Sequence, residues 1–213
     1  MARQKLQRFR ELPLFDNIAQ TTDANLKTKL KKFLGTKSNI ILELACGKGE
    51  YALALAELYP NKKYIGIDIQ GERLWFACTN AKNKKINNVF FLRIAIEDLN
   101  KYFKAKSVSE IWLTFPDPFP RLKQAKKRLT SPRFLLIYKK ILKTDGIIHL
   151  KTDDKNLFDY SVSTIKNNNG KIVERIEDIY KDKNPSPQLS IKTYYENRHL
   201  KAGKKIYYLS FKL

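Results

Sequence analysis

The chain has few cysteines and no long apolar segment, and each shortage excludes a class of protein. Its two cysteines, Cys46 and Cys78, lie outside any Cys-x-x-Cys pair or Cys/His cluster with metal-ligand spacing. A disulfide framework is therefore excluded, and we expect no metal site. No segment approaches the roughly 18 consecutive apolar residues of a membrane helix, and the N-terminus lacks the apolar centre of a signal peptide. These absences predict a cytoplasmic protein without membrane association.

Acidic residues are scarce as well. The 213 residues include 42 Lys and Arg but only 21 Asp and Glu, which gives a net charge of +21. Three segments carry the excess: residues 1–35, residues 121–143 and residues 181–213. A positive charge of this size, unevenly distributed, indicates a polyanionic partner such as a nucleic acid.

The length and the 43% hydrophobic content suit one substantial core. We therefore predict a single domain over residues 1–213, with residues 1–35 as a basic N-terminal arm or helix packed on it. Nothing in the sequence indicates an obligatory protein partner.

Apolar runs alternate with amphipathic segments in the rhythm of parallel α/β units. Ser131 before Pro132 is a typical helix start, in which the serine side chain caps exposed amides, and we expect Asp145-Gly146 to end that helix. The pattern predicts a doubly wound, mostly parallel sheet with an antiparallel addition at the C-terminus. The predicted strands are 39–44, 64–69, 89–94, 110–115, 147–151, 171–179 and 205–213, and the predicted helices are 50–58, 71–83, 132–143 and 156–167.

A glycine-rich turn follows the first predicted strand. Gly47 and Gly49 allow the backbone to approach a ligand at a helix N-terminus, and Asp68, at the end of the next strand, is placed to bind ribose hydroxyls. The turn also satisfies a dinucleotide fingerprint, so it does not choose the cofactor by itself. Glu43 favours a cationic ligand, because a carboxylate in an apolar strand is costly without a partner. We therefore favour S-adenosylmethionine over NAD, with a structural ion pair for Glu43 as the alternative.

Asp117 lies in the segment PDPFP at the end of another predicted strand. Prolines restrict the backbone on both sides of it, so the carboxylate is held on a stiff, non-helical segment. Five of the eight residues 121–128 are basic. The segment is interpreted either as a reaction site beside a surface that binds a polyanion or as a rigid turn followed by a solvated helix face.

Taken together, Glu43, the glycine turn, Asp68 and PDPFP resemble the bacterial tRNA (guanine-N7)-methyltransferases, the TrmB family. The segments HLKTD (149–153) and TYYE (193–196) resemble that family's substrate motifs. The resemblance extends over nearly the whole chain and implies a class I methyltransferase with a Rossmann-like fold. Four positions depart from the family pattern: Ala45 stands where glycine is frequent, Phe119 replaces tryptophan, Arg121 replaces a usual lysine, and Ala95 stands where an acid often contacts adenine.

The resemblance implies a role for each matching position. It makes Asp117 catalytic, and His149 is more consistent with a core histidine than with a base. The implied contacts are to S-adenosylmethionine from Glu43, Gly47, Gly49, Asp68, Ala95, Ile96, Glu97 and Asp117; to the substrate from Arg121, Asp153, Thr193, Tyr194, Tyr195 and Glu196; and to RNA from Lys123, Gln124, Ala125, Lys126, Lys127 and Arg128.

We expect the reaction to be methylation of N7 of a guanine in the variable loop of tRNA, at tRNA position 46. Guanine N7 carries a free lone pair, so alignment rather than a histidine base can drive transfer. Asp117 would orient the flipped guanine. The alternatives are an amino-group nucleic-acid methyltransferase, an NAD-dependent oxidoreductase and a non-catalytic nucleic-acid-binding protein.

Overall fold

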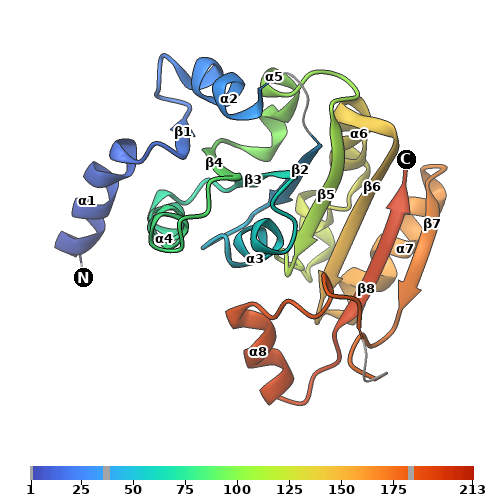
Figure 1. Cartoon of the computed structure of the whole chain (residues 1–213). Coiled ribbons are helices and arrows are strands. Elements are labelled where there is room, and N and C mark those ends of the chain that lie inside the picture. Colours follow the sequence, from blue (N-terminus) through green and yellow to red (C-terminus); the bar gives the residue numbers. More distant parts are fainter. Residues whose placement is uncertain (1, 36–38, 182–184) are drawn as a thin grey trace. The chain divides into compact units, whose positions relative to one another are not determined.

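The computed structural model describes residues 2–35, 39–181 and 185–213. The chain divides into two compact units, residues 1–102 and residues 103–213, and each has its own strands and helices (Figure 1). None of the described helices is both long enough and apolar enough to cross a membrane.

The first unit contains four parallel strands in the order β1-β4-β3-β2. The strands are β1 (Ile18–Gln20), β2 (Ile40–Leu44), β3 (Lys63–Ile67) and β4 (Val89–Arg93). The helices are α1 (Ala2–Glu11), η1 (Leu12–Leu14), α2 (Leu26–Leu34), α3 (Glu50–Leu58), α4 (Gly71–Asn83), η2 (Ile96–Asp98) and α5 (Leu99–Tyr102). Because the strands are parallel, their carboxyl ends lie at one edge of the sheet, where ligands of such sheets bind.

Close packing around Phe91 explains two of the glycines. A Cβ at Gly66 would lie 2.7 Å from the Phe91 ring, and a Cβ at Gly49 would also lie 2.7 Å from it. Gly49 also has a φ of +67°, in the left-handed region that favours glycine. The turn therefore requires glycine at Gly49 for both backbone and packing reasons.

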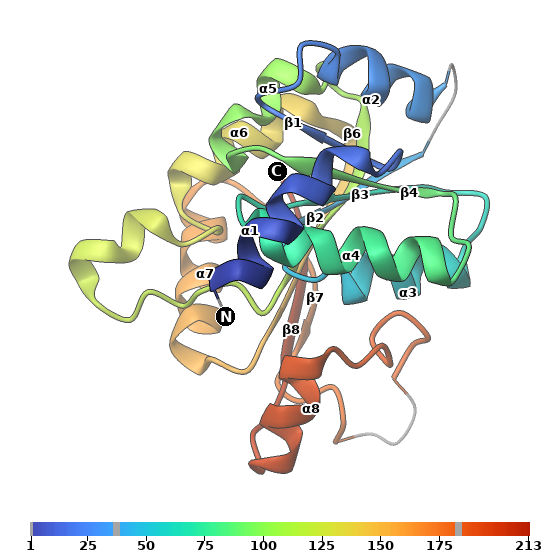
Figure 2. The ribbon, with the colours of Figure 1, turned by 90° about the vertical axis from the view of Figure 1, so that its left-hand side faces the viewer.

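The basic N-terminal segment packs along α4, as Figure 2 shows for α1. The Arg8 guanidinium lies 2.6 Å from the Glu72 carboxylate, and the indole of Trp75 donates to Glu11 at 2.8 Å. Strand β1 was not predicted from the sequence. It pairs with β4 over only three residues, which is too short for a periodic pattern to be recognised.

The second unit contains strands in the order β5-β6-β8-β7, side by side in Figure 1. Strands β5 and β6 are parallel, whereas β8 is antiparallel to both β6 and β7, which confirms the predicted antiparallel C-terminal addition. The strands are β5 (Val108–Thr114), β6 (Leu142–Thr152), β7 (Lys171–Ile176) and β8 (Tyr207–Lys212). The helices are η3 (Leu122–Lys127), α6 (Pro132–Ile141), α7 (Lys155–Asn167) and α8 (Tyr194–Lys201).

Several predicted details around α6 were wrong. The helix begins at Pro132 as expected, but the Ser131 hydroxyl donates to the Lys126 carbonyl instead of capping the helix. The helix ends at Ile141 rather than at residue 143, because Leu142 is extended and pairs with Val108 at the start of β6. Asp145 and Gly146 consequently lie within β6, at an irregularity of its pairing with β5, and do not terminate the helix.

The C-terminal strands are shorter than predicted. Strand β7 ends at Ile176 rather than at residue 179, and β8 begins at Tyr207 rather than at residue 205. Beyond both strands, the Ile179 amide donates to the Ile206 carbonyl at 2.9 Å.

Candidate functional site

The glycine turn after β2 is tied to the end of β3 by Asp68. One carboxylate oxygen of Asp68 accepts from the Gly47 amide at 2.9 Å, and the other accepts from the Gln70 amide at 2.8 Å. Only 6% of Asp68 is exposed. The structure therefore brings together Gly47, Gly49 and Asp68 at the carboxyl edge of the first unit, as the sequence predicted.

Glu43 has a structural partner at the same edge. Its carboxylate accepts from the Ala52 amide at 2.9 Å, in the first turn of α3. This contact satisfies an amide that the helix leaves unpaired and places a negative charge at the positive end of the helix. The amide contact gives the buried Glu43 carboxylate a partner within the protein. This partner is a backbone amide, whereas the alternative considered from the sequence was an ion pair.

Ala45 occupies a backbone conformation that favours glycine. Its φ is +55°, which is in the left-handed region and costs a residue with a Cβ roughly 1–2 kcal/mol. The next residue, Cys46, is buried and its amide donates to the Ile67 carbonyl at 3.0 Å. Burial raises the pKa of the Cys46 thiol, so this cysteine is an inert part of the core.

The third predicted cofactor segment follows β4. Ala95 and Ile96 are half-buried and Glu97 is exposed. Ile69, directly after Asp68, is 64% exposed, which is unusual for a large apolar side chain at a strand end. Ile69 was not among the predicted site residues, although its position beside Asp68, an acid predicted to bind ribose, was a usable signal.

In the second unit, Asp117 lies on a strained loop after β5. Its side chain is exposed, whereas Pro116 is buried and anchors the loop. Phe115 and Phe119 have φ values of +49° and +43°, so the residues two positions before and after Asp117 both occupy the left-handed region. Such conformations persist only where surrounding contacts impose them, and they cluster at functional sites.

The TYYE motif is a helix start. The Thr193 hydroxyl accepts from the Glu196 amide at 3.2 Å and begins α8, so the spacing is that of a capping box. This signal was present in the sequence, yet α8 was not predicted. Tyr194 and Tyr195 are 63% and 50% exposed, whereas Glu196 is fully buried. In this conformation a substrate can reach the two tyrosines but not the Glu196 carboxylate.

Glu196 is instead paired with Lys151 of β6. The Lys151 ammonium lies 2.8 Å from the Glu196 carboxylate and donates to the carbonyls of Leu189 and Ile191 at 2.9 and 2.8 Å. Tyr180 donates to the same carboxylate at 2.7 Å. Burial lowers the pKa of Lys151 to about 8, and Glu196 opposes that shift.

Asp153 contacts one side chain of α8 and one of the loop after that helix. Its carboxylate lies 2.6 Å from the Lys204 ammonium and 3.2 Å from the His199 ring. The His199 ring is stacked on Phe115, with the ring centroids 5.7 Å apart. The structure therefore joins the predicted substrate residue Asp153 to the strained loop that carries Asp117.

The three lysines of the predicted RNA-binding run and the predicted substrate residue Arg121 are exposed, but Arg128 is not. Arg121, Lys123, Lys126 and Lys127 are exposed, and Gln124 and Ala125 are half-buried. Arg128 is only 6% exposed, and its contact with RNA stays a prediction that this burial does not favour. The reason for the burial is local: its guanidinium donates to backbone carbonyls of the preceding loop.

Neither histidine is placed as a free base. His149 is buried, stacked on Trp112 with ring centroids 3.9 Å apart, and its Nδ1 lies 2.8 Å from the Tyr208 hydroxyl. It is a core residue, as the sequence predicted. Within the described residues, no group of three or more His, Cys, Asp or Glu side chains could hold a metal ion.

The comparisons with known proteins agree on a methyltransferase. A family model described as "Putative methyltransferase" matches residues 37–209. The tRNA (guanine-N(7)-)-methyltransferase of Christiangramia forsetii is 40% identical over 100% of this chain and 99% of its own length. The proteins of the same name from Bacteroides thetaiotaomicron and Cytophaga hutchinsonii are 40% and 35% identical, over 100% and 99% of this chain and 87% and 98% of their own lengths.

Similar solved structures support the fold. An antibiotic-related methyltransferase has a TM-score of 0.66 at 19% identity, covering 91% of this chain and 96% of its own. The 16S rRNA methyltransferase KamB has a TM-score of 0.66 at 11% identity, covering 87% and 93%. These neighbours confirm the class I methyltransferase fold, and the sequence relatives establish the family. The chain belongs to the family of the tRNA (guanine-N7)-methyltransferases.

Proposed function

We propose that the protein transfers a methyl group from S-adenosylmethionine to N7 of a guanine in the variable loop of tRNA. The observation that carries this proposal is Asp117, an exposed carboxylate on a strained loop. The chain that contains it is 40% identical over its whole length to a tRNA (guanine-N(7)-)-methyltransferase. Membership of a methyltransferase family removes the oxidoreductase and non-catalytic alternatives.

The chemistry of the first unit's edge fits the proposed donor. S-adenosylmethionine supplies an electrophilic methyl group on a sulfonium, and it also carries an ammonium and ribose hydroxyls. Asp68 and Glu43 place two carboxylates at this edge, which favour a cation and would repel the pyrophosphate of NAD. The Gly47 turn permits close approach of backbone to a ligand, and the exposed Ile69 offers an apolar surface for adenine.

Asp117 would bind the guanine and not act as a base. The lone pair of N7 is already free, so no proton must be removed before transfer, and the enzyme can act by orienting the acceptor. The Asp117 carboxylate would accept from N1–H or the amino group of the flipped base and stabilise the cationic product. Exposed Arg121, Lys123, Lys126 and Lys127 would bind the phosphates around it.

The test is to incubate the protein with labelled S-adenosylmethionine and unmodified tRNA and to identify the product nucleoside. We expect 7-methylguanosine in the variable loop. A labelled N2-methylguanosine or N6-methyladenosine would instead support the amino-group methyltransferase.

A further inference from the structure

Arg128 is the only member of the basic run 121–128 that is classed as buried. Its Nε donates to the Pro118 carbonyl at 3.0 Å, and its Nη2 donates to the Phe119 carbonyl at 3.1 Å. On another side, the guanidinium lies 4.3 Å from the centroid of the Tyr160 ring, on α7. The positive charge is thus held between two carbonyl dipoles and an aromatic face.

The two carbonyls lie on either side of one strained residue. The Pro118 carbonyl belongs to the peptide before Phe119, and the Phe119 carbonyl to the peptide after it. Fixing the orientation of both peptides fixes φ and ψ of Phe119, whose φ is +43°. A left-handed phenylalanine costs roughly 1–2 kcal/mol and needs contacts of this kind to persist.

The segment around Arg128 is itself anchored. The Thr130 hydroxyl forms a buried hydrogen bond of 2.7 Å with the hydroxyl of Ser161, which lies on α7. The Arg128 amide donates to the Ala125 carbonyl at 3.0 Å. Arg128 therefore connects a fixed helix to the loop that carries Asp117.

We propose that Arg128 is a positioning residue: it clamps the Pro118 and Phe119 carbonyls and so holds Asp117 in the orientation that binds guanine. This inference rests on the proposed function of Asp117. A guanidinium suits the task because its planar fork donates to both carbonyls at fixed geometry, whereas a lysine ammonium is a point donor on a flexible stem. RNA phosphates are bound by the exposed neighbours and not by Arg128.

The decisive comparison is between Arg128→Lys and Lys127→Ala. Arg128→Lys keeps the charge and removes the fork, so we expect kcat to fall at least tenfold. Its S-adenosylmethionine affinity and the salt dependence of its tRNA binding should match those of the wild type. Lys127→Ala should instead weaken tRNA binding and reduce the slope of log affinity against log salt by up to about one.

A second variant, Tyr160→Leu, tests the support of the clamp while Arg128 and the loop stay intact. It should lower kcat, as Arg128→Lys does, but by a smaller factor. A folded Arg128→Lys protein with kcat within twofold of wild type would overturn the proposal. It would also be overturned if Arg128→Lys reduced the salt slope of tRNA binding as much as Lys127→Ala does. Failure of the wild type to methylate tRNA would refute the proposed function instead.

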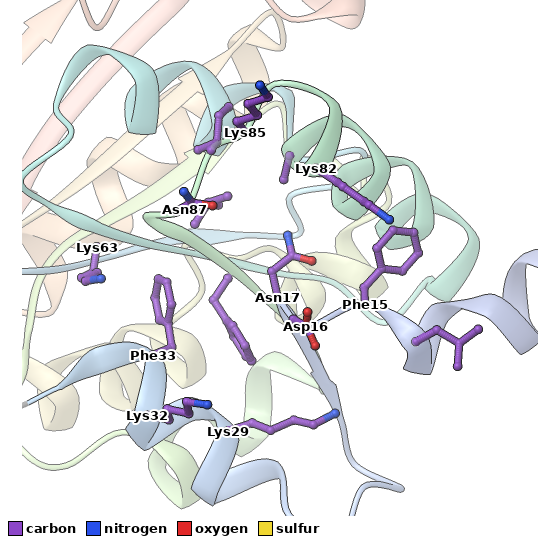
Figure 3. A pocket seen from close by; sticks show the side chains of 15 residues that line it. Phe15, Asp16, Asn17, Lys29, Lys32, Phe33, Lys63, Lys82, Lys85 and Asn87 are labelled. Atoms are coloured by element: carbon purple, nitrogen blue, oxygen red, sulfur yellow. The ribbon is translucent and has the colours of Figure 1, made fainter.

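A separate feature lies at the opposite edge of the first unit. An open hollow of about 1030 Å³ is lined by five lysines from α2, the start of β3, the end of α4 and the turn after α4 (Figure 3). They are Lys29, Lys32, Lys63, Lys82 and Lys85, and Asp16 is the single carboxylate among the lining residues. Lys63 begins β3 and Asp68 follows its end, so roughly 16 Å of strand separates the hollow from the glycine turn.

Only part of this charge is locally neutralised. Lys29 lies 3.6 Å from the Asp23 carboxylate, which offsets its charge, whereas Lys63 lies 4.8 Å from the centroid of the uncharged Phe33 ring and keeps its charge. The remaining three lysines are exposed at the rim. Ammonium groups from three separate elements around one hollow create a strongly positive potential, which suits the closely spaced phosphates of a nucleic acid.

We infer that this hollow binds the phosphate backbone of the tRNA at a distance from the methylated base. This inference also rests on the proposed substrate. The triple variant Lys32→Ala, Lys82→Ala, Lys85→Ala should raise the Kd for tRNA at least fivefold and flatten its salt slope, with kcat at saturating tRNA unchanged. The matched control removes three lysines outside the hollow: Lys104, Lys139 and Lys140.

An effect of the control variant on tRNA binding equal to that of the triple variant would mean that only total charge matters, and it would overturn the inference. Saturable binding of inorganic phosphate or a mononucleotide at the hollow, combined with an unchanged tRNA affinity in the triple variant, would also overturn it. In both cases methylation by the wild type would leave the proposed function intact.

Discussion

Lys151 and Glu196 form a fully buried ion pair that joins β6 to the start of α8, with 2.8 Å between the ammonium and the carboxylate. Removing one partner of such a pair leaves an uncompensated buried charge. Glu196→Gln should therefore lower the free energy of unfolding by about 3–5 kcal/mol, measured by urea denaturation. Because Thr193 to Tyr195 lead directly into this pair, we also expect weaker tRNA binding.

An exposed pair provides the control for that substitution. Lys155 and Asp159 lie 2.8 Å apart on the surface of α7, where solvent screens the pair, so Asp159→Asn should destabilise the fold far less than Glu196→Gln does. Equal losses in both variants would show that Glu196 is not buried with its charge paired.

The buried ammonium also predicts a pH dependence of stability. Burial lowers the pKa of Lys151 to about 8, below the ordinary value of 10.5 that it regains on unfolding. Between these two values the unfolded state binds more protons than the folded state, so this residue's contribution to stability rises with pH. Below pH 8 both states are protonated and the contribution is constant.

Urea denaturation of wild type and Lys151→Met at pH 7, 8, 9 and 10 isolates this contribution, because other groups titrate in both proteins. The difference in unfolding free energy should shift in favour of the wild type by about 1–3 kcal/mol across the range. A difference that stays constant with pH would contradict the lowered pKa of Lys151.

Ala45 predicts a stabilising substitution in the donor turn. Its φ of +55° is strained for alanine, so Ala45→Gly should raise the free energy of unfolding by up to about 1 kcal/mol. Ala45→Val should lower it, because a β-branched residue tolerates this region less well. Lys85, with a φ of +56° outside the turn, is the control. Lys85→Gly should stabilise the fold without changing donor affinity.

Isosteric substitutions that remove the charge test the two acidic residues of the proposed donor site. Asp68→Asn and Glu43→Gln should each weaken S-adenosylmethionine binding in calorimetry, because each removes a negative charge that favours the cation. Glu43→Ala should additionally lower the free energy of unfolding by about 1–3 kcal/mol, because the Ala52 amide loses its acceptor. Unchanged donor affinity in both isosteric variants, with intact circular dichroism, would exclude this turn as the donor site.

Local signals were sufficient to predict much of the fold. Helices α3 and α4 have the predicted bounds, because a glycine marks each start and the apolar periodicity extends to each end. Strand β1 was missed because three residues carry no period. The end of α6 was misplaced because long-range pairing of Leu142 with Val108 overrides the local turn signal of Asp145-Gly146.

The candidate site was predictable in composition but not in burial. Gly47 and Asp68 meet as expected, since parallel strands bring their carboxyl ends to one edge. Arg128 could not be distinguished from its exposed neighbours, because a basic run in sequence does not show which member turns inward. The burial of Glu196 could not be predicted either, because its ion-pair partner, Lys151, is distant in the sequence.

The most direct test of the central claim concerns the atom that is methylated. A tRNA carrying 7-deazaguanine at the target position keeps the Watson–Crick edge that Asp117 would bind, but it has no N7 lone pair. We expect this tRNA to bind with an affinity close to that of the unsubstituted tRNA and to accept no methyl group from labelled S-adenosylmethionine. Transfer of label to the 7-deazaguanine-containing tRNA at an exocyclic amine would contradict N7 methylation and favour the amino-group reaction.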